Sequence, residues 1–176
     1  MKRQLAGALL AAGIVLASCV ATVMPAAAAT SGSETLSGTI VASGVSGTRT
    51  VLSSVVVAKG VFSGVGTIVE VPNLPADPGN VSRDDLVFPG GSIHLVSINV
   101  DFSVSLTPNS CLATTTIQQT AEVAGGTGQF AAATGSFTAA VTGPALLARN
   151  PDGSCSFTQN PLHEVDMITA SGTLSF

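Results

Sequence analysis

The chain has 176 residues and a net charge of −4, with ten Asp and Glu against six Lys and Arg. Beyond Lys2 and Arg3 the basic residues are scattered, which excludes the positive patch that nucleic acid or an anionic lipid surface would require. The length suits one domain with a hydrophobic core.

Residues 1–29 have the layout of a secretory signal peptide. Two basic residues precede an apolar run, and a tract of small residues ends at Ala29. The run is near the roughly 20 residues that span a bilayer, but its small-residue end and the polar residues after it favour cleavage over a membrane anchor. We expect cleavage after Ala29, release from the cell, and a mature domain over residues 30–176 without a membrane span. Loss of the two basic residues changes the net charge from −4 to −6.

A second processing route is open at Cys19. The sequence Leu-Ala-Ser-Cys at 16–19 resembles a bacterial lipobox, in which the cysteine is lipidated and becomes the new N-terminus. The residues that follow Cys19 stay apolar, whereas a lipoprotein usually has a polar tether there. This route would anchor the protein to a membrane through Cys19 and would leave the fold unchanged.

The residues after the leader are rich in Val, Thr, Ser and Gly, and helix-favouring residues are rare. Alternating β-branched residues, broken by Gly, Pro, Asn and Asp, predict strands and turns. The segment PNLPADPGN, 72–80, contains three prolines and is expected to be a loop. The predicted strands are 34–42, 48–58, 61–71, 84–88, 92–106, 111–123, 136–147 and 165–176.

Many short strands without crossover helices predict an antiparallel barrel or sandwich. The first and last strands carry the same Ser-Gly-Thr sequence beside an aliphatic residue, at 37–39 and 171–173. Such a match suits two strands that pair and close the sheet, which removes exposed edges. We therefore predict an all-β fold, an eight-stranded antiparallel β-barrel in a single domain.

The clearest strand alternates apolar and polar residues with period two, as a strand with one buried face does. His94 shares the parity of Val96, Ile98 and Val100, so we expect these four side chains to face the barrel interior and to contact a ligand. An imidazole in the lumen could serve as a general acid or base, which makes His94 the one catalytic candidate. The alternative is a histidine at a strand end that hydrogen-bonds loop backbone.

The acidic residues form no catalytic or metal motif. Asp84 and Asp85 are adjacent, so in a strand they would face opposite ways, and a solvated turn is favoured. Glu164 and Asp166 share a face, with His163 on the other, but no third ligand is clustered with them. We expect neither a metal nor a cofactor.

Cys111 and Cys155 are the two cysteines of the mature chain, and each follows a turn-forming segment that contains proline. An even pair in an exported protein predicts a disulfide. No CxxC pair is present, and two cysteines without a neighbouring histidine do not make a zinc site. We predict a Cys111–Cys155 bond.

The stretch GGTGQFAAATG, 125–135, raises the question of a phosphate-binding loop. No lysine follows Lys59 anywhere in the chain, and no helix pattern surrounds the glycines, so neither a P-loop nor a dinucleotide fingerprint is present. Glycines instead permit a sharp turn with positive φ angles. We expect a turn from which Phe130 fills the core.

This stretch is similar to the signature of the allene oxide cyclase and dirigent-type barrel superfamily, and the segment DLVFPGGSIH, 85–94, looks like one seen in secreted bacterial members. The resemblance implies an eight-stranded barrel over residues 34–176 with a partly apolar lumen, and a trimer as in many plant members. It transfers no catalytic residue. The matching positions are Gly125, Gly126, Thr127, Gly128, Phe130, Ala133 and Gly135.

Three functions follow as hypotheses. The first is a non-catalytic barrel that binds an apolar small molecule, or a partner, in or near its lumen. The second is a dirigent- or cyclase-like isomerase that acts in the cavity. The third is a cell-surface structural barrel that is fully packed. The lumen separates them, because side chains that fill it would leave only the third.

Overall fold

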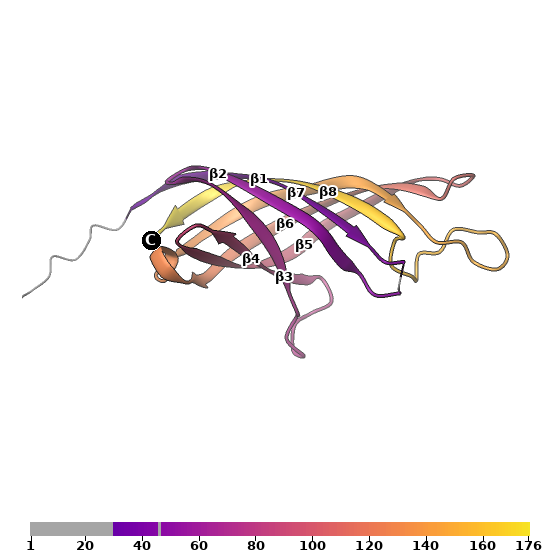
Figure 1. The fold of residues 1–176 in the computed structure, drawn as a ribbon, viewed down its shortest axis with the longest axis horizontal. Helices are drawn as coiled ribbons and strands as arrows, with labels where there is room; N and C mark the ends of the chain where they lie inside the picture. The colour runs from indigo at the N-terminus through magenta and orange to yellow at the C-terminus, as the bar shows by residue number, and fades with distance from the viewer. Residues whose placement is uncertain (1–29, 46) are drawn as a thin grey trace, which may run out of the picture.

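The computed structural model describes residues 30–45 and 47–176, so the predicted leader, its cleavage site and Cys19 lie outside the described residues. The described chain forms a closed barrel in which each strand pairs antiparallel with the next and the last pairs with the first (Figure 1). The strands are β1 (Ser31–Ser43), β2 (Thr50–Gly60), β3 (Ser63–Val71), β4 (Val81–Phe88), β5 (Gly91–Thr107), β6 (Leu112–Gly126), β7 (Thr134–Leu146) and β8 (His163–Ser175).

The predicted eight-stranded antiparallel barrel is confirmed, and so is its closure by the first and last strands. Ser37 of β1 lies opposite Thr169 of β8, and Ser33 lies opposite Thr173. The two Ser-Gly-Thr segments therefore belong to strands that pair with each other. Closure pairs the first strand with the last and so removes the two free edges that an open sheet would have.

The proline-rich segment after β3 is a loop, as predicted, and Figure 1 shows it projecting from the barrel wall. It is held at both ends by side chains. Asn73 donates from Nδ2 to the Val81 carbonyl oxygen at 2.7 Å, and the Asp77 carboxylate binds the guanidinium of Arg83.

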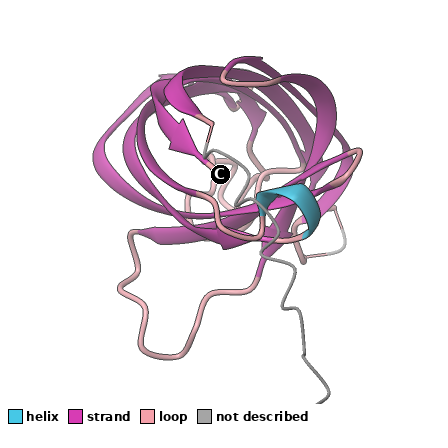
Figure 2. Cartoon of the chain, turned by 90° about the vertical axis from the view of Figure 1, so that its left-hand side faces the viewer, coloured by secondary structure: helices cyan, strands magenta, loops and turns pink. Residues whose placement is uncertain are grey.

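One end of the barrel is closed by four phenylalanines. The Phe62 ring centroid lies 4.9 Å from that of Phe88 and 5.0 Å from that of Phe130, and Phe130 lies 4.9 Å from Phe176. Edge-to-face contacts at these distances stabilise a core beyond the area they bury. Figure 2 looks onto this end, where the short helix and the C-terminus lie.

The short helix, η1 (Gly128–Phe130), comes from the glycine-rich stretch. Gly128 has a φ of 57°, and a Cβ there would collide with the Gly90 carbonyl group, so the turn requires glycine. Thr127 Oγ1 accepts a hydrogen bond from the Ser92 backbone N–H at 3.0 Å, which ties the turn to β5. Phe130, completely buried, points into the closed end. This stretch is architecture.

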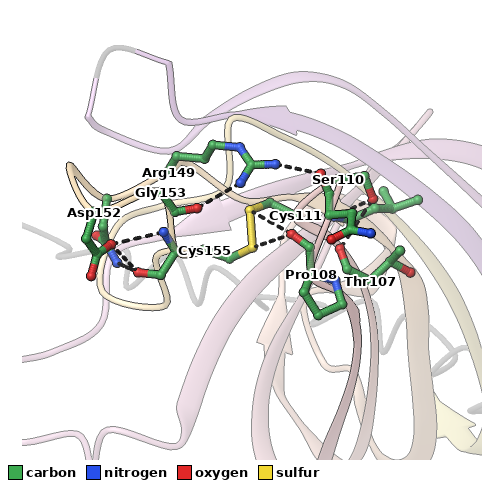
Figure 3. The surroundings of a disulfide bond; sticks show 12 residues. Thr107, Pro108, Ser110, Cys111, Arg149, Asp152, Gly153 and Cys155 are labelled. Carbon is green, nitrogen blue, oxygen red and sulfur yellow. Dashed lines mark hydrogen bonds between the residues drawn. A yellow bond between two sulfur atoms is a disulfide. The ribbon is translucent and has the colours of Figure 1, made fainter.

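The opposite end carries the β1–β2, β3–β4, β5–β6 and β7–β8 loops, and there the predicted disulfide is confirmed. Cys111 and Cys155 are bonded with their Cα atoms 5.4 Å apart. Arg149 reinforces the link by donating to the Asn109 carbonyl oxygen at 2.7 Å and to the Gly153 carbonyl oxygen at 2.8 Å. Figure 3 shows how the bridge joins the β5–β6 turn to the long β7–β8 loop. The disulfide therefore holds these two loops together at this end of the barrel.

Candidate functional site

The barrel lumen contains a cavity of about 590 Å³. Its inner wall is largely aliphatic and aromatic, with contributions from Leu36, Val56, Ile68, Leu86 and Phe137. Cavities of several hundred Å³ with apolar walls and a few polar groups are the usual form of small-molecule sites. The side chains therefore leave the lumen partly open above the phenylalanine-closed end.

The outer part of the lumen, called here the mouth, is charged. Arg49, in the β1–β2 loop, is the centre of an ion-pair cluster with carboxylates from two strands. It binds Glu70 of β3 and Glu164 of β8, and its Nη2 lies 3.1 Å from Asp166 Oδ2. Glu164 and Asp166 are two residues apart in β8, so their side chains share one face, as predicted, and this face is the one that lines the cavity. All three bonds draw the Arg49 side chain over the lumen.

A fourth mouth carboxylate, Asp84 of β4, lies directly opposite Glu70 in the β3–β4 ladder. Within the described part of the chain no side chain hydrogen-bonds or ion-pairs with it. Burial, together with the charge of Glu70, raises the pKa of Asp84 to about 6. Burial and the charge of Glu164 also raise the pKa of Asp166. The mouth therefore holds more acid groups than Arg49 can neutralise.

The second cation on the cavity wall is Arg83, and it is engaged elsewhere. Its Nε lies 2.7 Å from Asp77 Oδ2 and its Nη2 lies 3.0 Å from Asp77 Oδ1, a two-bond pair with the β3–β4 loop. This pair and the Leu74 backbone N–H lower the pKa of Asp77 to about 2. Uncharged polar groups complete the wall, where Gln119 Nε2 donates to Asn99 Oδ1 at 2.8 Å.

The prediction that His94, Val96, Ile98 and Val100 of β5 face the barrel interior is wrong. The side chains of Ile98 and Val100 are 42% and 61% exposed, and none of the four predicted residues lines the cavity. His94 lies on the outer wall, where its Nδ1 is 2.6 Å from Asp85 Oδ1. Val96 lies on the same outer face of β5 as His94, Ile98 and Val100.

The reason for the error is that β5 has a polar lumen face. Leu95, Ser97 and Asn99 line the cavity, and two of these three side chains are polar. The outer wall carries the β-branched residues instead. Register shifts on either side of this stretch, between Ile93 and Leu95 and again between Asn99 and Asp101, further break a simple alternation.

Asp84 and Asp85 do face opposite ways, but the solvated turn favoured for them is wrong, because both lie within β4. His163 and Glu164 occupy opposite faces at the start of β8. Among residues 30–45 and 47–176, no group of three or more His, Cys, Asp or Glu side chains is arranged to hold a metal ion.

Sequence reasoning missed Arg49, Glu70 and the role of Asp84. These residues are separated by 21 and 14 positions along the chain and are brought together only by strand pairing across the barrel. A weak signal was present, because Glu70 and Asp84 each continue the alternation of a strand on its apolar face. This alternation places Glu70 and Asp84 in the lumen only once the inward faces of β3 and β4 are known.

Comparison of the chain with protein-family models, with curated proteins and with solved structures gives no match. The resemblance to the allene oxide cyclase and dirigent-type superfamily therefore stays a prediction, as does the trimer it implies. In the part of the chain that the structure describes, no helix is long and apolar enough to cross a membrane.

Proposed function

We propose that this protein is a non-catalytic binding protein that holds one small, largely apolar molecule in the lumen of its barrel. The observation that supports the proposal is the open cavity of about 590 Å³ above a phenylalanine-closed end. Burial of apolar ligand surface against such a wall contributes roughly 25 cal/mol per Å² before the costs of association. The site is preformed, so little ordering of the protein opposes binding.

We also propose that binding takes place outside the cytoplasm, after removal of residues 1–29. The Cys111–Cys155 bond supports this, because disulfides persist in oxidising compartments and are rare in the cytosol. The two routes at the leader, release after Ala29 or lipidation at Cys19, differ in the mass of the mature N-terminus. Mass spectrometry of the exported protein would distinguish them.

The test of lumen binding uses Nile red, an uncharged apolar dye, titrated into the protein and followed by fluorescence. We expect saturable binding at one site per chain. Val141→Phe places a larger side chain on the cavity wall and should abolish binding. Val65→Phe makes the same change on the outer wall, where Val65 is 61% exposed, and should leave binding intact.

Native mass spectrometry of the purified protein complements the titration. We expect a bound molecule to add mass to the wild type and to Val65→Phe and to be absent from Val141→Phe. If Nile red bound Val141→Phe as well as the wild type, the lumen would not be the binding site and the proposal would fail.

A second candidate function, an isomerase that acts in the cavity, has one observation in its favour. Asp84 is a carboxyl group on the cavity wall whose pKa is raised to about 6, which suits proton transfer near neutral pH. If a ligand is recovered, incubation with wild type and with Asp84→Asn, followed by product analysis, tests it. Recovery of unchanged ligand from the wild type would contradict catalysis.

A further inference from the structure

We propose that the ligand of the lumen is a cationic amphiphile: an apolar molecule whose polar end is an amine or another cationic group, seated against Asp84 and Glu70. This inference rests on the proposed function, since it names the chemical class of the molecule that the lumen takes. Three features of the mouth support it.

The first feature is the imbalance of charge. Four carboxylates, those of Glu70, Asp84, Glu164 and Asp166, line the cavity near its opening, and Arg49 is the cation placed among them. Two charges interact more strongly in a partly buried site than in water, because the surroundings screen them less. A cation that enters the mouth is therefore attracted, and an anion is repelled.

The second feature is that both arginines on the cavity wall are already paired with carboxylates. Arg49 places its Nε, Nη1 and Nη2 on three different carboxylates. Arg83 uses its Nε and Nη2 for the two oxygens of Asp77. A fatty acid or a phosphate ester would meet two guanidinium groups whose charge is already balanced by carboxylates, and those carboxylates would repel its own negative charge.

The third feature is the state of Asp84. This carboxylate is half-buried and aimed into the lumen, and no described side chain hydrogen-bonds to it. A half-buried carboxylate without a partner is unfavourable, and a cation that supplies the partner removes that cost. Arg49 acts on Asp84 only through its charge, because its bonds go to the other three carboxylates, so a hydrogen-bonding position on Asp84 is left for a ligand.

The geometry of β3 and β4 connects the charged and apolar parts of the site. Glu70 lies opposite Asp84, and two residues further into the barrel Ile68 lies opposite Leu86. Residues two apart in a strand share a face. A molecule with its cationic end on the two carboxylates therefore continues directly onto the Ile68–Leu86 surface, as an amphiphile requires.

The test compares three ligands of equal chain length, decylamine, decanol and decanoate, by isothermal titration calorimetry at pH 7.5 below their aggregation concentrations. We expect decylamine to bind about tenfold more tightly than decanol, as a partly desolvated ion pair would provide, and decanoate to bind most weakly. The differences in affinity among the three ligands should become smaller as salt is added, because salt screens the charges.

Variants locate the head group. Asp84→Asn should weaken decylamine binding by about tenfold while decanol binding changes by less than about twofold. Asp85→Asn is the matched control, since it makes the same change one residue away on the outer wall, and it should leave all three affinities unchanged. Thermal melts establish that each variant is folded, and Ala139→Phe replaces Val141→Phe as the lumen-blocking variant if the latter does not fold.

The outcomes separate this inference from the proposed function. Equal affinities for the three ligands, all lost in the lumen-blocking variant, would overturn the cationic preference and leave lumen binding in place. Tighter binding of decanoate than of decylamine would also overturn it. Binding that persists in the lumen-blocking variant, or no binding of any ligand, would overturn both.

Discussion

Asp84 and Asp85 are neighbours in β4, yet the Asp84 carboxylate lines the lumen without a side-chain partner, whereas the Asp85 carboxylate bonds His94 on the outer wall. One peptide bond thus separates two chemically different environments. The pair provides a matched comparison, because the same Asp→Asn change can be made on either side of the wall.

The first prediction concerns the pH dependence of stability. The pKa of Asp84 is about 6 in the folded protein, above its ordinary value of 3.8, so the folded state binds this proton more tightly than the unfolded state. Its contribution to stability is therefore full below about pH 4 and is lost as the pH rises through 6. Asp84→Asn should remove this dependence and stabilise the protein at pH 7.5 by on the order of 1–3 kcal/mol.

Urea unfolding of wild type, Asp84→Asn and Asp85→Asn at pH 4 and pH 7.5 measures this effect. The difference between wild type and Asp84→Asn should be larger at the higher pH. A destabilised Asp84→Asn at pH 7.5 would show that the carboxylate has a stabilising partner in solution.

The second prediction concerns Arg49. Arg49→Gln leaves Glu70, Glu164 and Asp166 without their cation in the half-buried mouth, so it should destabilise the fold by about 1–3 kcal/mol at pH 7.5. The loss should be smaller at pH 4, because Asp166, whose pKa is raised by burial and by the charge of Glu164, takes up a proton as the pH falls and then no longer needs the cation. Lys59→Gln, an exposed residue of β2, is the control and should change the free energy of unfolding by less than about 0.5 kcal/mol.

The third prediction concerns the closed end. Phe130 is completely buried among three other phenylalanines, so Phe130→Ala should cost about 3–5 kcal/mol of unfolding free energy through lost burial and a cavity. Phe157→Ala removes the same group from a side chain that is 63% exposed and should have little effect. Comparable losses in both variants, measured by chemical denaturation, would mean that the four rings do not form the core of that end.

The fourth prediction concerns the disulfide. Cys111 and Cys155 close a loop with a sequence separation of 44, for which the loss of chain entropy in the unfolded state predicts about 4 kcal/mol of stabilisation. Reduction should therefore lower the melting temperature of the wild type. The double variant Cys111→Ala, Cys155→Ala should melt at the reduced temperature with or without the reductant. A melting temperature of the wild type that reduction leaves unchanged would contradict a stabilising bridge.

Much of the fold was predictable because the relevant signals are local. The prolines of residues 72–80 exclude a strand wherever the segment lies, and β-branched alternation favours a strand before any partner is known. Cys111 and Cys155 are the two cysteines that follow the predicted leader, so the prediction of their pairing required no geometry. Closure was predictable because it satisfies the backbone of the first and last strands together.

The site was less predictable because two local patterns compete. In β5 the Val96, Ile98 and Val100 face looked like the buried one, since apolar residues usually point inward. In this barrel the inward face of β5 near the mouth lines an open cavity rather than a packed core. The polar residues Ser97 and Asn99 therefore point inward instead. Sequence alternation shows that a strand has two faces, and it does not show which of them is enclosed.

The strands, their order, the disulfide and the glycine turn at Gly128 follow from local sequence, because each depends on backbone conformation or on residues with a unique partner. Three relationships appear only in the folded chain: which strand faces form the lumen, that Phe130 packs against three other rings, and that Arg49, Glu70 and Asp84 meet at one mouth. These relationships depend on how elements distant in sequence are paired, and a shift of one residue in the register of β3 or β4 would turn Glu70 or Asp84 to the opposite face.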